Sequence, residues 1–279
     1  MSSFFDLLDA ACTLNSSLLC IGLDPEPSLI PKAAIFDFNR QVVDYTKDLV
    51  CAYKPNLAFY EAEGIQGIRA LEKTVNHIRK VAPKVIIIGD GKRGDIGNTA
   101  QKYAHSLFEV WGFDATTVNA YGGHDTIQPF TSYKNKGTFI WCRSSNPSAK
   151  DFQDRNVISE DEDNQTTLYE VVAKEAKGWN ENKNIGLVLG ATFPDTLNQV
   201  RTICPELPFL IPAVGAQGGN LEASVRNGVD MNGRRAIISS SRAILYPSRD
   251  KHSSKSTREM ANAFRNAIND VLTTQGYSW

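Results

Sequence analysis

Long apolar runs are missing from this sequence, and their absence argues against a membrane-spanning helix. No apolar stretch approaches the roughly 18 residues that a transmembrane helix needs. The N-terminal stretch 1–12 (MSSFFDLLDAAC) has no basic residue and carries Asp6 and Asp9 within its apolar part, which is unlike a signal peptide. We interpret residues 1–16 instead as a short amphipathic helix that caps the fold.

Cysteine pairs and an excess of charge of either sign are also missing. The five cysteines include no CxxC pair, and Cys20 and Cys142 lie in apolar stretches. We therefore expect buried free thiols and a reducing, cytoplasmic compartment. The 30 Lys and Arg residues balance 31 Asp and Glu residues, for a formal net charge of −1. This balance gives no electrostatic support for nucleic acid or an anionic membrane as a partner.

Short apolar stretches alternate regularly with longer amphipathic ones. The short stretches have the composition of parallel strands that are buried on both faces, and the longer ones repeat apolar residues at helical spacing. The predicted strands are residues 17–23, 49–54, 84–89, 115–119, 137–142, 185–189, 208–211 and 235–239. The predicted helices are residues 38–48, 64–81, 100–111, 126–133, 168–179, 195–203, 221–227 and 257–272. Eight strand–helix units favour an α/β fold of the (β/α)₈ TIM-barrel type, with residues 1–279 as a single domain.

One segment does not fit this alternation. Residues 144–167 (SSNPSAKDFQDRNVISEDEDNQTT) are polar and acidic, and they follow the fifth predicted strand. Irregular segments of this length inside a compact domain are uncommon and usually have a function or lack order. We interpret the segment as an inserted loop at the carboxyl end of the barrel, where barrel enzymes carry their active sites.

Ionisable and polar residues recur where the predicted strands end. A single Asp in such a place is more often a helix cap or turn residue, and a single Lys is usually a solvated surface group. Their recurrence at six strand ends is what indicates a site. The residues are Asp24, Lys54, Asp90, Lys92, Asp95, Ser144, Ser145, Gln217 and Arg242.

The segment 90–99 (DGKRGDIGNT) is the most informative of these strand ends. Asp90 and Lys92 are two residues apart, so both project the same way if the chain is extended, and Asp95 follows three residues later. The spacing predicts an alternating negative–positive–negative array. Flanking carboxylates favour the ammonium form of lysine, and a positioned ammonium group can act as a general acid. The alternative is a salt-bridge network on a glycine-rich loop.

The last two strand–helix units have the composition of a phosphate site. Barrels often bind phosphate through the loops after the seventh and eighth strands. Gly215, Gly218 and Gly219 allow backbone amides to approach an anion, Gln217 offers an amide donor, and Arg242 offers a planar guanidinium. A glycine-rich turn and a surface arginine would be the ordinary interpretation of either feature alone.

At these residues the sequence resembles the orotidine 5′-phosphate decarboxylase family, and the similarity covers nearly the whole chain. The family pattern DxKxxDIxxT is present as Asp90, Lys92, Asp95, Ile96 and Thr99. The segments GLDP, YKPN, VNAYGG, SSNPSAKDFQ, VGAQGG and SSSRAILYPS also occur along the chain in the expected order. Among its members the chain is most similar to the longer bacterial branch.

The resemblance implies an activity, an assembly and a set of roles. The enzyme would convert orotidine 5′-monophosphate to uridine 5′-monophosphate and CO₂ in pyrimidine synthesis. It would use no metal and no organic cofactor, and it would be a homodimer with shared sites. Lys92, flanked by Asp90, would donate a proton to C6, and Asp95, Ile96 and Thr99 would contribute to the partner's site. Asp24, Lys54 and Thr99 would contact the ribose. Ser145, or Ser144 if the register slips, would contact the pyrimidine, and Gln217 and Arg242 would bind the phosphate.

Two other functions remain as alternatives. The related 3-keto-gulonate 6-phosphate decarboxylases and hexulose 6-phosphate synthases use Mg²⁺, with a metal-binding carboxylate at the end of the second strand. This chain has Lys54 there, and a lysine would repel Mg²⁺. The other alternative is a non-catalytic barrel that binds a phosphate ligand, although such a protein would be free to lose Lys92. His124 and Asp125 are interpreted as a turn and a helix cap.

Overall fold

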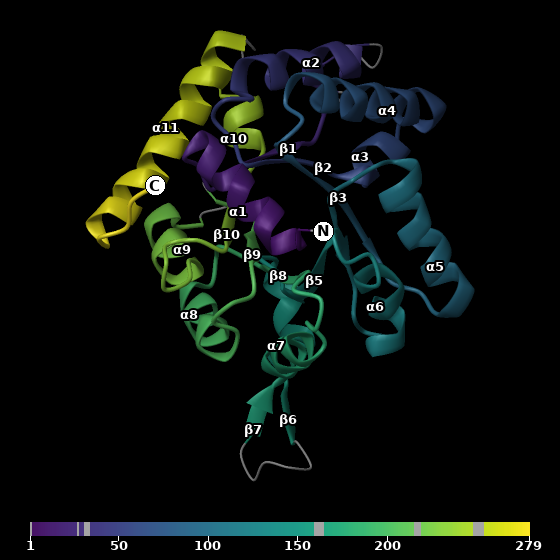
Figure 1. Ribbon diagram of the computed structural model, residues 1–279, viewed down its shortest axis with the longest axis vertical. Coiled ribbons are helices and arrows are strands. Elements are labelled where there is room, and N and C mark those ends of the chain that lie inside the picture. The colour runs from purple at the N-terminus through teal and green to yellow at the C-terminus, as the bar shows by residue number, and fades with distance from the viewer. Residues whose placement is uncertain (1, 27, 31–33, 159–164, 215–218, 248–253) are drawn as a thin grey trace.

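Eight parallel strands close into a barrel in the computed structural model of the protein, which describes residues 2–26, 28–30, 34–158, 165–214, 219–247 and 254–279 (Figure 1). The order around the barrel is β1-β10-β9-β8-β5-β4-β3-β2, so the first and last strands are neighbours. The barrel strands are β1 Leu19–Leu23, β2 Ala52–Pro55, β3 Ile86–Arg93, β4 Ala115–Val118, β5 Gly137–Arg143, β8 Ile185–Leu189, β9 Phe209–Ile211 and β10 Ala236–Ser240. The predicted TIM-barrel class is confirmed, and each predicted strand overlaps an observed one.

Helices surround the barrel and cover its outer face (Figure 1). Apolar strand residues are therefore buried on both faces, as in β1 and β8, where every residue is buried. The helical elements are α1 Phe4–Asn15, α2 Ile35–Thr46, α3 Leu57–Glu61, α4 Gly64–Val81, α5 Gly97–His105, a π-helical turn η2 Ser106–Val110, α6 His124–Thr131, a 3₁₀ helix η3 Pro147–Asp151, α7 Leu168–Gly178, α8 Pro194–Ile203, α9 Leu221–Gly228, α10 Arg242–Leu245 and α11 Ser254–Thr274. None of these described helices is both long enough and apolar enough to span a membrane.

Helix α1 lies against the amino end of the barrel. Phe4 is fully buried and makes an edge-to-face contact with Phe139, at 5.9 Å between ring centroids. The first residue of β5, Gly137, has no room for a side chain, because an added Cβ would lie 2.5 Å from the Phe4 ring. The opposite, carboxyl end of the barrel is left for a site.

The segment after β5 contains more regular structure than the loop predicted from its composition. Its described part includes η3 and an antiparallel pair, β6 Asn156–Ile158 and β7 Gln165–Thr167, which projects beyond α7 (Figure 1). Three of the six side chains in this pair are exposed, and only Thr166 is buried. Strands of three residues are too short to show an alternation of apolar and polar residues, which is why the sequence did not reveal them.

Candidate active site

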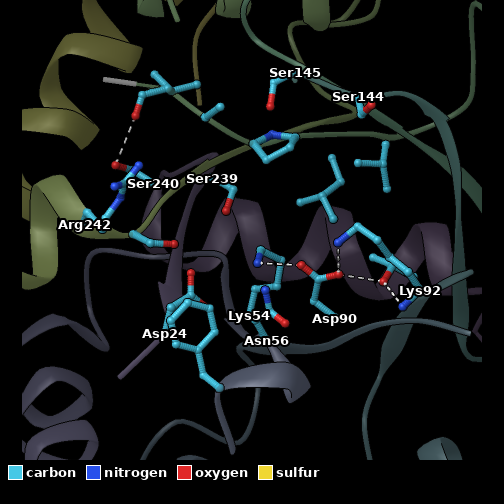
Figure 2. A pocket seen from close by; sticks show the side chains of 18 of the residues that line it. Asp24, Lys54, Asn56, Asp90, Lys92, Ser144, Ser145, Ser239, Ser240 and Arg242 are labelled. Carbon is cyan, nitrogen blue, oxygen red and sulfur yellow. Dashed lines mark hydrogen bonds and ion pairs between the residues drawn. The ribbon is translucent and has the colours of Figure 1, made fainter. Parts of the chain in front are cut away.

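A cavity of about 500 Å³ opens at the carboxyl ends of the barrel strands. Its residues come from strand ends and from the loops that follow, and many of their polar groups point into it (Figure 2). The lining residues labelled in Figure 2 are Asp24, Lys54, Asn56, Asp90, Lys92, Ser144, Ser145, Ser239, Ser240 and Arg242. The barrel thus brings together predicted residues that are more than two hundred positions apart in sequence, such as Asp24 and Arg242.

Asp90 lies at the centre of the charged groups in this cavity. Its Oδ2 atom accepts a hydrogen bond from Lys54 Nζ at 2.9 Å, and its Oδ1 atom accepts one from Lys92 Nζ at 2.7 Å (Figure 2). The backbone at Asp90 also bridges to Asn56, which fixes the end of β2 beside β3. One carboxylate therefore holds two ammonium groups in place.

Burial and charge act in opposite directions on this cluster. Burial alone would raise the pKa of the Asp90 carboxyl, but Lys54 and Lys92 outweigh it and hold that pKa well below its usual value. Burial alone would lower the pKa of Lys54, but Asp90 and Asp24 raise it above its usual value. Asp90 is consequently a carboxylate and Lys54 an ammonium group at neutral pH.

Asp95, Ile96 and Thr99 are not among the residues that line the cavity. The Asp95 carboxylate accepts a hydrogen bond from the backbone N–H of Ile96 at 2.8 Å, and Ile96 is 65% exposed just before α5. The negative–positive–negative array expected from spacing is therefore not what a single chain holds. The array around Asp90 is positive–negative–positive, because Lys54 and Lys92 each form an ion pair with one of its two carboxylate oxygens.

Asp24 and Arg242 lie at the side of the cavity that is formed by β1 and β10. The Oδ1 atom of Asp24 is buried and has no hydrogen-bond partner among the described residues. Arg242 is the first residue of α10 and lines the cavity with Ser240 and Ser241. Gln217, Gly215 and Gly218 lie outside the described residues.

Ser144 and Ser145 both line the cavity where β5 ends. The backbone N–H of Ser144 donates to Gln153 Oε1 at 2.8 Å, and its hydroxyl donates to Asn146 Oδ1 at 2.6 Å. The carbonyl of Ser145 accepts from the Thr192 hydroxyl at 3.3 Å. The turn at Ser144 and Ser145 is thus held by Gln153 of the inserted segment and by Thr192 of the loop after β8.

Several polar residues of this region gave no clear signal in the sequence. Asn56, Thr117 and Asp154 were not singled out, although Asn56 stands inside the quoted YKPN segment. A threonine in the middle of a buried strand, as in ATTV, is the signal that could have drawn attention to Thr117. Asp154 carried no signal, because only folding places it against Arg143.

A closed parallel barrel with a charged cavity at its carboxyl end defines a TIM-barrel enzyme. Residues 17–256 match the model of the Orotidine 5′-phosphate decarboxylase / HUMPS family, and the chain belongs to that family.

Relatives and solved structures agree with this assignment. The chain is 45% identical over 274 residues to the orotidine 5′-phosphate decarboxylase of Paracidovorax citrulli, covering 96% of this chain and 98% of the relative. It is 45% identical over 267 residues to that of Dehalococcoides mccartyi, covering 95% and 97%. The structure is similar to Leishmania donovani OMP decarboxylase, with a TM-score of 0.84, 36% identity, and coverage of 97% and 99%. A putative orotidine-monophosphate-decarboxylase from Toxoplasma gondii gives a TM-score of 0.89 at 36% identity, with 99% of each chain covered.

Proposed function

We propose that this chain decarboxylates orotidine 5′-monophosphate to uridine 5′-monophosphate and CO₂, the last step of de novo pyrimidine synthesis, with neither a metal nor an organic cofactor. The observation that carries the proposal is the Asp90 carboxylate held between Lys54 and Lys92 in the cavity. Loss of CO₂ leaves an electron pair on C6 of the pyrimidine, and this developing charge requires a nearby cation and a proton.

Lys92 is the proposed proton donor. As the bond between C6 and the carboxylate breaks, the electron pair remains on C6, and the Lys92 ammonium group delivers a proton there. Asp90 orients Lys92 through the 2.7 Å hydrogen bond and lies near the substrate carboxylate. The fixed ammonium group stabilises negative charge at C6 without having to reorganise during the reaction.

The remaining residues are proposed to bind the substrate. Asp24 and Lys54 contact the ribose hydroxyls, and the buried, unpartnered Oδ1 atom of Asp24 supports this role because a hydroxyl would satisfy it. Ser145, with Ser144 as the alternate, contacts the pyrimidine amide edge. Arg242 binds the 5′-phosphate together with Gln217. Phosphate binding remote from C6 supplies energy that orients the ring.

A homodimer with shared sites would account for the residues that lie outside the cavity of one chain. Asp95, Ile96 and Thr99 are proposed to complete the partner's site, with Thr99 at the partner's ribose. The 65% exposure of Ile96 supports this, because an apolar side chain beside a carboxylate on the surface is suited to burial against a second copy. We place the enzyme in the cytoplasm, since all five cysteines are free and buried.

The chain's own donor set is ill suited to the Mg²⁺ chemistry of the family's other branch. Both oxygens of Asp90 already accept hydrogen bonds from ammonium groups, and the position that would need a carboxylate is Lys54.

We further propose that residues 1–279 form one domain, in which 1–16 is a capping helix and 144–167 an insertion.

A direct assay tests the proposed function. Purified protein treated with EDTA is mixed with orotidine 5′-monophosphate, and the ultraviolet absorbance of the substrate is followed. Rapid loss of absorbance without added metal is expected. Activity that appears only with Mg²⁺ would favour the metal-dependent branch, and binding without any turnover would favour a non-catalytic barrel.

A further inference from the structure

Strand β3, which carries Asp90 and Lys92, has a register shift relative to its neighbour β4 at these residues. Gly89 pairs with Thr116 and Arg93 pairs with Val118, so Asp90, Gly91 and Lys92 together lie opposite the single residue Thr117. Bulges of this kind bend a strand and redirect its side chains. The two charged residues of β3 therefore owe their direction to an irregularity that faces one residue of β4.

The hydroxyl of Thr117 joins both ends of this bulge. It donates a hydrogen bond to Asp90 Oδ1 at 2.7 Å and accepts one from the backbone N–H of Lys92 at 2.9 Å. Thr117 is 1% exposed, and it borders the cavity. The direction of each hydrogen bond is fixed, because the backbone N–H of Lys92 can only donate and the Asp90 carboxylate can only accept.

The backbone of Lys92 has an unusual conformation that the hydrogen bond to Thr117 helps to maintain. Lys92 has a φ angle of +43°, in the left-handed region that residues other than glycine seldom adopt. Such a conformation persists only when its surroundings fix it. The hydrogen bond from Lys92 N–H to Thr117 is one fixed point, and the ion pair from Lys92 Nζ to Asp90 Oδ1 is the other.

Thr116 shows what a merely structural threonine does on the same strand. It is fully buried, and its hydroxyl donates to the carbonyl of Gly89 at 2.8 Å without touching a charged group. Adjacent strand residues point to opposite faces, so Thr116 points away from the barrel interior that Thr117 faces. The two residues form a matched pair that differs in its contact with the charged array.

We propose that Thr117 is a positioning residue for the reaction: its hydroxyl holds the Asp90 carboxylate and the left-handed backbone of Lys92 in one arrangement, so that the Lys92 ammonium group is aimed at C6. The inference rests on the proposed decarboxylation. Strand β4 would thereby fix the relative placement of Asp90 and Lys92, which neither residue can do alone.

The test compares Thr117→Val with Thr116→Val, since each replaces a buried hydroxyl by a methyl group on the same strand. In Thr117→Val we expect kcat to fall about 10- to 100-fold, because small misplacements of a reacting group have effects of this size. KM should change little, and Thr117→Ser should restore most of the activity. Thr116→Val should keep its kcat near the wild-type value. If Thr117→Val does not fold, Thr117→Ala makes the same comparison.

Hydrogen exchange of the Lys92 amide, followed by NMR, gives a readout that does not depend on activity. Exchange should be faster in Thr117→Val than in wild type, and unchanged in Thr116→Val. A Thr117→Val enzyme with the kcat and Lys92 exchange of the Thr116→Val control would overturn the inference, and so would a Thr117→Ser enzyme as impaired as Thr117→Val. An inactive wild type would refute the proposed function instead, while the exchange data would still report on the hydrogen bond.

Discussion

Arg143 and Asp154 form a two-point ion pair that joins the end of β5 to the segment inserted after it. Arg143 Nη2 donates to Asp154 Oδ2 at 2.9 Å, and Nε lies 2.7 Å from Oδ1. The arginine is 2% exposed, and its guanidinium carbon lies 3.8 Å from the centroid of the Phe193 ring. Because Arg143 Nη1 also donates to the carbonyl of Ser144, the ion pair helps to fix the turn that carries Ser145.

Asp154→Asn should therefore affect substrate binding as well as stability. Loss of the charge partner should lower the free energy of unfolding by about 1 kcal/mol, a modest value because the aspartate is partly solvated. KM should rise more than kcat falls, since the expected disorder is at the pyrimidine contact. Steady-state kinetics and urea unfolding measure both effects, with the exposed Asp151→Asn on the same segment as the control. An unchanged KM in Asp154→Asn would show that the turn does not depend on this pair.

Lys92→Ala should abolish turnover while the protein still folds. A general acid contributes roughly 10²- to 10⁴-fold, and Lys92 also supplies the cation opposite the developing charge, so we expect a loss of at least about 10⁴-fold in kcat. Circular dichroism confirms folding, and Lys102→Ala on the exposed side of α5 is the control. Near-normal activity in Lys92→Ala would be incompatible with the proposed mechanism.

Arg242→Ala should weaken binding through the phosphate. Loss of charge-assisted hydrogen bonds to phosphate should raise KM for orotidine 5′-monophosphate by roughly 10- to 150-fold. The phosphate-free nucleoside orotidine should be processed equally by wild type and variant. Arg226→Ala, which removes only a surface ion pair with Glu222, serves as the control. An equal loss of activity with both substrates would mean that Arg242 does not act through the phosphate.

Two inactive variants should restore activity to each other when they are mixed. If Asp95 serves the partner's site, a heterodimer of Asp95→Ala and Lys92→Ala subunits contains one intact composite site. Activity should appear after subunit exchange and be absent from either variant alone. Exchange is verified by native mass spectrometry, and no recovery after proven exchange would mean that Asp95 acts within its own chain.

The Asp90 ion pairs should make the stability of the protein sensitive to acid. The folded-state pKa of Asp90 lies below its usual value, so its stabilising contribution is present above the unfolded-state pKa of about 4 and is lost as pH falls below it. Asp90→Asn leaves the buried Lys54 ammonium group without its main partner, which should cost about 3–5 kcal/mol at pH 7. Urea unfolding should show this difference from wild type narrowing as pH falls from about 5 to 3. A difference that is constant with pH would mean that Asp90 contributes little through its charge.

The sequence was sufficient for the barrel and for the charged residues, but not for the contacts between neighbouring strands. Runs such as IGLVL and KVIIIG predicted strands because burial on both faces leaves an apolar signature. The short helices α3 and α10 and the β6–β7 pair left none, since they are too short or too exposed for a periodic pattern.

The same limit applies within the site. Asp90, Lys92 and Lys54 could be found because polar and ionisable residues recur at six of the predicted strand ends. The importance of Thr117 depends on the register shift between β3 and β4, which no local pattern encodes. The ion pair between Lys54 and Asp90 also follows from three-dimensional closure of the barrel rather than from spacing along the chain.

The pairing of β1 with β10 constrains how the protein can be made. Residues Leu19, Cys20 and Ile21 have their partners in Ile238, Ser239 and Ser240, which are synthesised more than two hundred residues later. Until then β1 has an unpaired edge that is open to wrong partners, and a contact of such long range forms slowly. The same late step brings Asp24, just after β1, and Arg242, just after β10, to one cavity. A chain truncated before β10 would thus lose both its closure and its binding site, which makes incomplete products of translation inactive and prone to aggregation.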